Sequence, residues 1–555
     1  MAPKAFGVAV LGILLLTAFV HSPGFANPFL FFDDPQNVVE NPAIRALTTH
    51  SLKTFFTTPL LGMYSPLVSL SYAIDFRIGA LDATVYHATN LALHLLNVVL
   101  LGLVARRLSG QSACGAVVAL LFGVHPLNVA AVTPLSVRSS LLYSAFYLAA
   151  YLAYLSYARH GQRRWFAAAL VCFVLAGLSK SAAIVFPVVL LLTDAYTGRR
   201  WSRGVWLEKL PFLLVSSGVA VLAVAFRGDL GAGHAFSLIE RIGLALYSVA
   251  YYGIKLALPV GLSPLHPYPE RVDGHLPLMV HIAPLAIVAV VTIAWFWTSR
   301  RRLLAFGGLF FLINIALVLK VVPLGVEFMA DRYVYLPSIG PLLVAVEIGL
   351  AGAPARRRVA VAVFAVVALW FSAASYSRAA DWRDRLSFET RVLQQYPDDP
   401  DAHAGLGIAL AENGRLEEAI GHFMRAATLD PANAATRANL AAAHANLART
   451  LLANGRTADA ATELRAALKL ADSGSTHYLL GSALAELGQL QEAVAEYESA
   501  LTDEALARSP ELHNDLGVAL GRLGRADAAA ALFREALRLD PTFEAAKANL
   551  QKSGR

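Results

Sequence analysis

The sequence predicts an all-α protein in which a bundle of membrane-spanning helices is followed by a solenoid of paired helices. Of the 555 residues, 57% are hydrophobic and 15% are charged, whereas a soluble domain has about 45–50% apolar and about 25% charged residues. From about residue 400 the long apolar stretches end, and a regular spacing of small and aromatic residues begins. The composition excludes an ordinary soluble enzyme and a disordered chain, and it assigns residues 1–378 to the membrane.

The charged residues divide the chain at the same place. Residues 398–555 carry 22 acidic and 15 basic side chains, while residues 1–397 carry 17 acidic and 31 basic ones. The arginines of the first part form short clusters between apolar stretches, which is how membrane proteins fix their orientation. Nucleic acid is therefore not an expected partner, although the net charge is +7. The two cysteines lie in apolar stretches and indicate neither disulfides nor a cysteine metal site.

About 20 consecutive apolar residues are needed to cross a bilayer. Residues 165–193 form either one long helix or a tight pair broken at Lys180, and residues 238–258 either span or lie at the interface. Both alternatives give about eleven spans, with the N-terminus inside and everything after residue 378 outside. All five arginine clusters lie inside if 165–193 crosses twice, so we prefer the tight pair. The first stretch also has features of a signal peptide, but the later spans favour its retention as an anchor. The clear stretches are 5–20, 85–105, 111–127, 140–158, 209–226, 278–298, 303–320, 334–352 and 359–377.

A helical repeat occupies residues 400–555, after a linker at 379–399. Small residues at fixed positions let two helices approach closely, and an aromatic residue fills the gap beside them. The first copy has Gly407, Ala419, Phe423, Ala426 and Pro431, and a copy at 511–543 repeats this spacing. With two further copies between them, one of which is less regular, the spacing matches four tetratricopeptide (TPR) repeats of 34 residues, followed by a cap helix at 542–551. A TPR stack forms a groove for a peptide or protein, so we expect a protein partner.

Two adjacent carboxylates, Asp33 and Asp34, lie in the outer loop after the first span. One of them is suited to deprotonate a hydroxyl, while the other orients it or holds a cation. The alternative is a turn or a helix cap formed by the Asp-Asp-Pro sequence.

Further polar residues gather at the same outer face. Arginine and lysine there suit a phosphate leaving group, although isolated ones also reach toward lipid head groups without a further role. Asp331 and Arg332 alternatively form a local ion pair that caps a helix. The candidates are His125, Arg138, Lys180, His266, Asp331 and Arg332.

Several sequence blocks, taken in order with the repeats behind them, resemble one family. The chain is similar to the transmembrane and TPR-repeat-containing O-mannosyltransferases and their bacterial relatives, which are polytopic glycosyltransferases of the GT-C superfamily. The blocks are Phe32-Asp33-Asp34, 86–97, His125-Pro126-Leu127, Ser179-Lys180, 262–265, Val322-Pro323-Leu324, 330–340 and Trp382.

The resemblance implies an enzyme that uses a polyprenyl-phosphate-linked sugar and transfers it to a protein hydroxyl. Asp33 and Asp34 are then the catalytic pair, in a direct displacement with an oxocarbenium-like transition state. Lys180, Arg138 and Arg332 would stabilise the departing phosphate. In a bacterium the TPR domain is expected in the periplasm, and in a eukaryote in the lumen of the endoplasmic reticulum. A divalent metal is compatible with the acidic pair, and so is its absence.

Three departures from the family pattern leave the substrate open. The family often has a glutamate where this chain has Ala130 and another where it has Ser181, and an arginine is missing from Tyr64-Ser65-Pro66. Mannose is therefore not assumed. A transferase acting on a glycan or lipid, and a non-enzymatic membrane scaffold that displays a TPR groove, remain alternatives.

Overall fold

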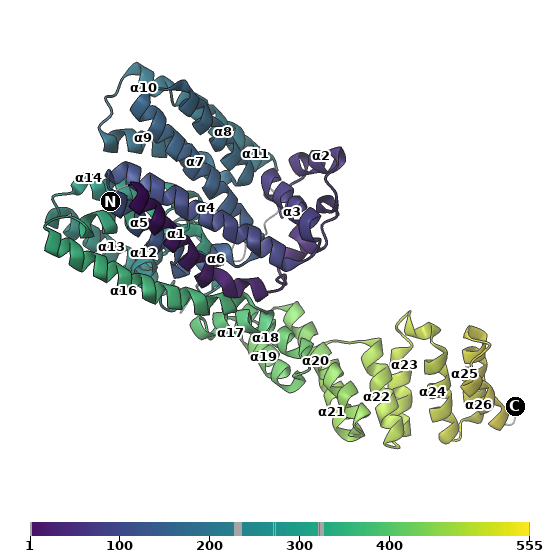
Figure 1. The fold of residues 1–555 in the computed structure, drawn as a ribbon. Helices are drawn as coiled ribbons and strands as arrows, with labels where there is room; N and C mark the ends of the chain where they lie inside the picture. The colour runs from purple at the N-terminus through teal and green to yellow at the C-terminus, as the bar shows by residue number, and fades with distance from the viewer. Residues whose placement is uncertain are drawn as a thin grey trace. The chain divides into compact units, whose positions relative to one another are not determined.

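The computed structural model describes residues 3–226, 236–269, 271, 274–319, 321 and 327–553. The block Val322-Pro323-Leu324 lies outside these residues. The chain divides into two compact units, Met1–Gln395 and Tyr396–Arg555. Both units are built almost entirely from helices (Figure 1).

In the described part of the first unit, seven helical segments are long and apolar enough to cross a membrane, or eight if a bent pair counts as one span. The helices at their centres are α1 (Pro3–His21), α4 (Ala83–Ser109), α7 (Arg138–His160), α11 (Leu210–Ala225), α13 (Leu278–Trp297), α14 (Arg301–Ile315) and α16 (Pro354–Arg378). The membrane helix bundle followed by helical repeats is the architecture that the composition predicts.

Among the described residues, fewer helices meet this criterion than the predicted eleven spans, because several apolar stretches are broken. Residues 111–127 divide into α5 (Ser112–Gly123) and α6 (Pro126–Val132), which are bent by 65°, since a proline cannot continue the preceding helix. Lys180 separates α8 (Arg163–Ser179) from the short helix η5 (Ser181–Val185) and α9 (Phe186–Thr197). Residues 165–193 therefore form the helix pair broken at Lys180 and not one long helix.

Two other stretches also fall short of a full span. Residues 334–352 form only an eleven-residue helix, α15 (Ile339–Gly349). The 20-residue helix α12 (Leu238–Ala257) contains Glu240, Arg241 and Lys255 and is not among the seven described candidates.

The outer loop and the connections complete this unit with short elements. A two-stranded antiparallel sheet pairs His266 with Met329 and thereby joins two loops that are far apart in the sequence. The elements are η1 (Ser22–Ala26), η2 (Pro35–Val39), η3 (Pro42–Arg45), α2 (Thr49–Thr57), α3 (Pro66–Gly79), η4 (Leu135–Val137), α10 (Arg203–Leu207), β1 (His266–Pro267), η6 (Ala316–Val318), β2 (Glu327–Met329), η7 (Asp331–Val334), η8 (Ala379–Trp382) and α17 (Arg385–Gln395).

Glycines let the membrane helices pack at backbone contact. A Cβ added at Gly307 of α14 would lie 2.8 Å from the carbonyl oxygen of Gly340 on α15, whereas one added at Gly308 meets no described atom within 4 Å. Helices in lipid have no hydrophobic driving force between them and associate through van der Waals packing instead. Small residues at the crossing allow the close approach that this packing needs.

We expect Gly307→Ala to destabilise the protein by about 1–3 kcal/mol, because overpacking of a tight contact costs energy in this range. Gly308→Ala is the matched control, since it makes the same change one residue away on the exposed face of α14. Thermal unfolding in detergent micelles measures both. Equal melting temperatures for the two variants would contradict the packing argument.

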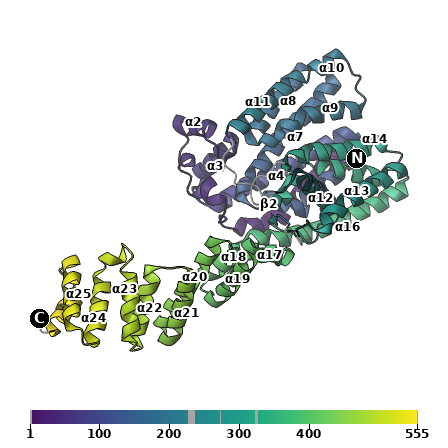
Figure 2. The ribbon, with the colours of Figure 1, turned by 180° about the vertical axis from the view of Figure 1, so that it is seen from behind.

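The second unit consists of four helix pairs and a final helix, and each pair lies beside the next in both views (Figures 1 and 2). Gly407, Gly481 and Gly517 face Phe423, Tyr497 and Phe533, and a Cβ on any of them would approach the ring to 2.7–2.8 Å. Each ring therefore fits beside its helix only because the facing residue is a glycine. The elements are α18 (Pro400–Glu412), α19 (Leu416–Leu429), α20 (Ala434–Ala453), α21 (Thr457–Leu470), α22 (Gly474–Glu486), α23 (Leu490–Ala500), η9 (Leu506–Arg508), α24 (Pro510–Arg522), α25 (Ala526–Leu539) and α26 (Glu544–Lys552).

Candidate active site

Four charged side chains from distant parts of the sequence form one electrostatic cluster, which we call the Asp33 cluster. Arg332 of η7 forms an ion pair with Glu327 of β2, and the Tyr333 hydroxyl donates to the same carboxylate at 3.0 Å. The charges of Arg332 and Glu327 act on both Asp33 and Lys180. The structure therefore brings together three of the residues singled out from the sequence and adds Glu327.

Lys180 owes its position to the break between α8 and η5. Its ammonium group donates to the Ser140 hydroxyl at 2.8 Å and lies 5.7 Å from the centre of the Tyr143 ring. Both contacts are to α7. Both partners are neutral groups, so neither contact is an ion pair with the ammonium group.

The two adjacent aspartates occupy different environments. Asp34 is fully buried, and its two carboxylate oxygens accept hydrogen bonds from the backbone amides of Leu30 at 2.7 Å and Ser136 at 3.0 Å. Asp33 is exposed, and the charges of Arg332 and Glu327 act on its carboxylate. Asp34 thus fixes the outer loop to the segment before α7, while Asp33 remains accessible to a substrate.

Burial also shifts the protonation of both groups. It raises the pKa of Asp34 from 3.8 to about 6, although the hydrogen bonds from Leu30 and Ser136 oppose the shift. Asp33 is exposed at the surface, but the protein around it removes part of the water next to its carboxylate. This desolvation raises the pKa of Asp33 as well, and the positive charge of Arg332 acts in the opposite direction. Both shifts follow from the cost of moving a carboxylate out of water.

The Asp34 shift predicts a pH-dependent stability. The folded-state pKa lies above the unfolded one, so this group's contribution is fully present below pH 3.8 and is lost as the pH rises through about 6. Relative to Asp34→Asn, the wild type should lose about 2 kcal/mol between pH 4 and 7, since one pKa unit corresponds to about 1.4 kcal/mol. Unfolding in detergent at several pH values measures this difference, and parallel curves for the two proteins would contradict it.

Arg138 has an internal role. It is fully buried and forms an ion pair with Asp75 of α3 at 2.5 Å. Its Nε donates to Asn90 at 2.8 Å and a terminal nitrogen donates to the Tyr86 carbonyl at 3.0 Å, while the guanidinium stacks over Tyr72. All three nitrogens are engaged, so this geometry does not support the phosphate-binding role expected from the sequence.

A second internal network holds the loops behind the site. Asp331 accepts hydrogen bonds from His266 at 3.0 Å and from Arg378 of α16 at 2.6 Å, and Arg378 also donates to the carbonyl of Pro126 at 2.7 Å. Burial acts to raise the pKa of Asp331, but the charge of Arg378 and the contact with His266 outweigh it and lower this pKa. The alternative in which Asp331 pairs with Arg332 is wrong, because Arg332 pairs with Glu327.

His125 belongs to the same internal framework. Its Nδ1 accepts the hydrogen bond of the Leu127 amide at 3.2 Å, which caps the N-terminus of α6, and its Nε2 contacts the Leu256 carbonyl at 3.1 Å. Both ring nitrogens are therefore occupied in the folded protein.

Aromatic side chains support the outer loop just before Asp33. Phe388 of α17 contacts the rings of Phe31 and Phe32 at centroid distances of 5.7 and 5.2 Å. The Arg385 guanidinium lies 4.0 Å from the Phe31 ring centre. The stretch 379–399, expected to be a linker, is thus largely helical and part of the framework of the loop.

Sequence reasoning missed Asp75, Glu327 and Arg378. Asp75 was identifiable as a carboxylate in an otherwise apolar stretch, and Glu327 lies only four residues before the Asp331-Arg332 pair. Arg378 gives no such signal, because it ends a span where arginines commonly reach the membrane surface. Among the residues that the structure describes, no group of three or more His, Cys, Asp or Glu side chains is arranged to hold a metal ion.

Comparisons with known proteins agree with this architecture. The tetratricopeptide repeat model matches residues 387–434, 445–505 and 478–542. Protein O-mannosyl-transferase F38B6.6 of Caenorhabditis elegans is 22% identical over 72% of this chain and 60% of its own length. Protein O-mannosyl-transferase TMTC3 of Homo sapiens is 22% identical over 76% of this chain and 51% of its own length. Tmtc3 of Drosophila melanogaster is 26% identical over 76% of this chain and 55% of its own length.

Several solved TPR proteins are similar to part of the chain. The TPR protein YrrB, described as having an unusual peptide-binding site, is 20% identical over 30% of this chain and 81% of its own, with a TM-score of 0.25. MamA is 20% identical over 28% of this chain and 86% of its own, with a TM-score of 0.23. The chain spans about half the length of the curated relatives it matches. Its homologues are protein O-mannosyl-transferases that carry TPR repeats, as the sequence blocks predicted.

Proposed function

We propose that this chain is a membrane glycosyltransferase of the GT-C type. It transfers a sugar from a polyprenyl-phosphate donor to a hydroxyl group of a protein on the extracytoplasmic face of the membrane. The observation that carries the proposal is the Asp33 cluster, in which the charges of Arg332 and Glu327 act on an accessible carboxylate, Asp33, and also on Lys180. A base and two cations are what a displacement with a phosphate leaving group requires.

Each member of the cluster has a separate role in the reaction. The acceptor hydroxyl oxygen attacks the anomeric carbon, the bond between that carbon and the phosphate oxygen breaks, and the hydroxyl proton passes to Asp33. Lys180 and Arg332 bind the departing phosphate and compensate its charge. Glu327 holds Arg332 in place. Asp34 positions the loop and takes no proton from the substrate.

The TPR unit supplies the acceptor side of the proposal. Arrays of this kind bind peptide or protein segments in their groove, and the family model matches most of residues 387–542. The arginine clusters of the first unit support an orientation with its N-terminus inside the cell and the TPR unit outside, in the periplasm if the chain is bacterial. Mannose is the sugar suggested by the names of the relatives.

Sugar transfer in membranes tests the proposal. Membranes from a strain lacking the protein, with and without the plasmid-borne chain, are incubated with a panel of radiolabelled polyprenyl-phosphate sugars and the protein fraction of the outer compartment. We expect label in protein only when the chain is present, and its release by alkaline β-elimination, which cleaves sugars from serine and threonine. Label that appears only in glycan or lipid would contradict the proposal that the acceptor is a protein. Absence of transfer from every donor would favour the alternative that the chain is a non-enzymatic membrane scaffold.

A further inference from the structure

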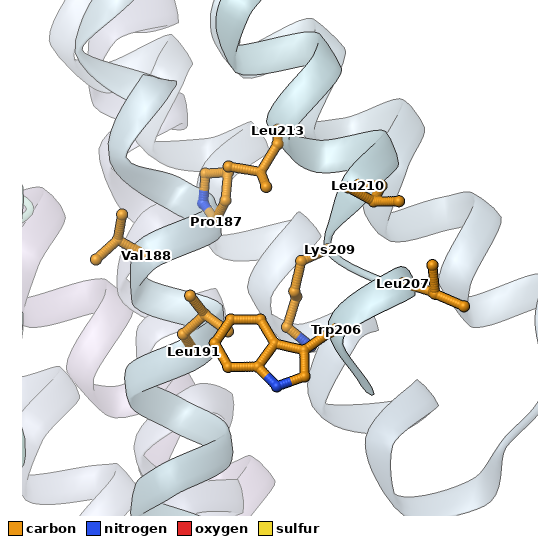
Figure 3. Close-up of a pocket in the computed structure, with 8 residues that line it drawn as sticks. All are labelled: Pro187, Val188, Leu191, Trp206, Leu207, Lys209, Leu210 and Leu213. Carbon is orange, nitrogen blue, oxygen red and sulfur yellow. The ribbon is translucent and has the colours of Figure 1, made fainter. Parts of the chain in front are cut away.

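An apolar cavity lies between α9, α10 and α11. Its volume is about 190 Å³. Figure 3 shows the Trp206 ring reaching from α10 toward Leu191 of α9, with the Lys209 stem behind it. We call this cavity the Trp206 notch; it is lined by Pro187, Val188, Leu191, Trp206, Leu207, Lys209, Leu210 and Leu213.

The lysine in the notch is not available to a ligand. Its ammonium group is buried and donates to Asp194 at 2.7 Å and to the Tyr154 hydroxyl at 2.6 Å. Arg199 is likewise paired with Glu208 at 2.7 Å. These internal ion pairs fix the turn between α9 and α11, and only the hydrocarbon stem of Lys209 contributes to the lining.

Two other arginines in the same turn have uncompensated charges. Arg200 and Arg203 are exposed, and neither has an ion pair or hydrogen bond to the part of the chain that the structure describes. Beside them, Trp201 stacks on Trp206 at a centroid distance of 5.2 Å, and both indoles are about half exposed. The hydrocarbon-lined recess thus includes one indole, Trp206, which stacks on a second one, and the same turn of the chain carries two exposed arginines.

Tryptophan pairs of this kind mark the boundary between the membrane core and the head groups, and basic residues at such a boundary recruit anionic lipids. We propose that the Trp206 notch is a binding site for an anionic glycerophospholipid. One acyl chain fills the recess, and the head-group phosphate lies between Arg200 and Arg203. The arginine clusters place this turn on the inner side, whereas the sugar donor is used at the outer side, so the occupant is a phospholipid and not the sugar carrier.

Quenching of tryptophan fluorescence by brominated lipid tests the site in the full-length protein. The chain is reconstituted into vesicles of phosphatidylcholine and phosphatidylglycerol in a fixed ratio, and only the lipid that carries the bromine is changed. The contribution of the two indoles is obtained by subtracting the signal of a Trp201→Phe/Trp206→Phe variant. We expect half-maximal quenching of this contribution at an about tenfold lower mole fraction for brominated phosphatidylglycerol than for brominated phosphatidylcholine.

The preference should disappear in Arg200→Gln/Arg203→Gln and persist in Arg357→Gln/Arg358→Gln, a matched pair of exposed arginines in another cluster. Equal quenching by the two lipids in the wild type would overturn the proposal, and so would a preference that survives in the first variant. If both variants lose the preference for phosphatidylglycerol equally, the preference comes from the overall positive charge of the protein and not from a specific binding site. Relief of quenching by polyprenyl phosphate, but not by unbrominated phosphatidylglycerol, would assign the notch to the sugar carrier instead.

Discussion

Replacing Asp33 by asparagine should lower kcat for sugar transfer by about 10²–10⁴-fold, the range that general base catalysis supplies. Asparagine keeps the size and polarity of the side chain but cannot accept the proton of the acceptor hydroxyl. The KM for the donor should change little, because Lys180 and Arg332 remain to bind the phosphate. Initial rates of the purified protein at saturating donor and acceptor measure the effect.

Two variants in the same loop make the result specific. Glu40→Gln removes another exposed carboxylate of the outer loop and should leave kcat unchanged. Asp34→Asn should act mainly on stability, because both carboxylate oxygens are bound by backbone amides. Near-normal kcat in Asp33→Asn would remove this residue from the chemistry, and a folded Asp34→Asn protein with the larger loss of kcat would exchange the two roles.

Replacing Arg332 by glutamine should lower kcat by about 10²–10³-fold, as expected when one group that stabilises developing charge is removed. The substitution also leaves Glu327 without its cation, so a carboxylate then faces the departing phosphate. The double variant Glu327→Gln/Arg332→Gln should therefore be more active than Arg332→Gln alone.

This order separates an electrostatic role from a structural one. If the pair only held β2 and η7 together, the double variant would be at least as impaired as the single one. Rates are measured with all three variants, including Glu327→Gln, at matched melting temperatures. A double variant slower than Arg332→Gln would show that the pair is structural, and it would leave Lys180 as the only proposed phosphate ligand.

The sequence predicted the fold class because helical membrane segments and TPR repeats are specified by local patterns. Hydrophobic stretches and the spacing of Gly407 and Phe423 need no knowledge of distant contacts. The interruptions were harder to predict. The apolar stretch 334–352 has the composition of a span. However, its first residue ends the short helix η7, and the turns that follow delay the start of α15 until Ile339.

The proposed site combines residues that the sequence singles out with residues that it does not. Asp33, Lys180 and Arg332 stand out as polar residues beside apolar stretches, whereas their surroundings depend on contacts across the fold. Arg138 gives the same signal as Lys180, and only the position of Asp75, 63 residues earlier in the chain, distinguishes a buried ion pair from a free cation. Glu327 acquires its meaning only when β2 and η7 bring it to Arg332.

The contact of α17 with Phe31 and Phe32 has a consequence for how such chains evolve. The match to the TPR model begins at residue 387, inside α17, yet this helix belongs to the first compact unit. Each repeat of a solenoid touches only its neighbours, so repeats can be gained or lost after residue 395 while the support of the Asp33 loop stays intact. The number of repeats can then diverge among relatives without a change in the framework that holds this loop.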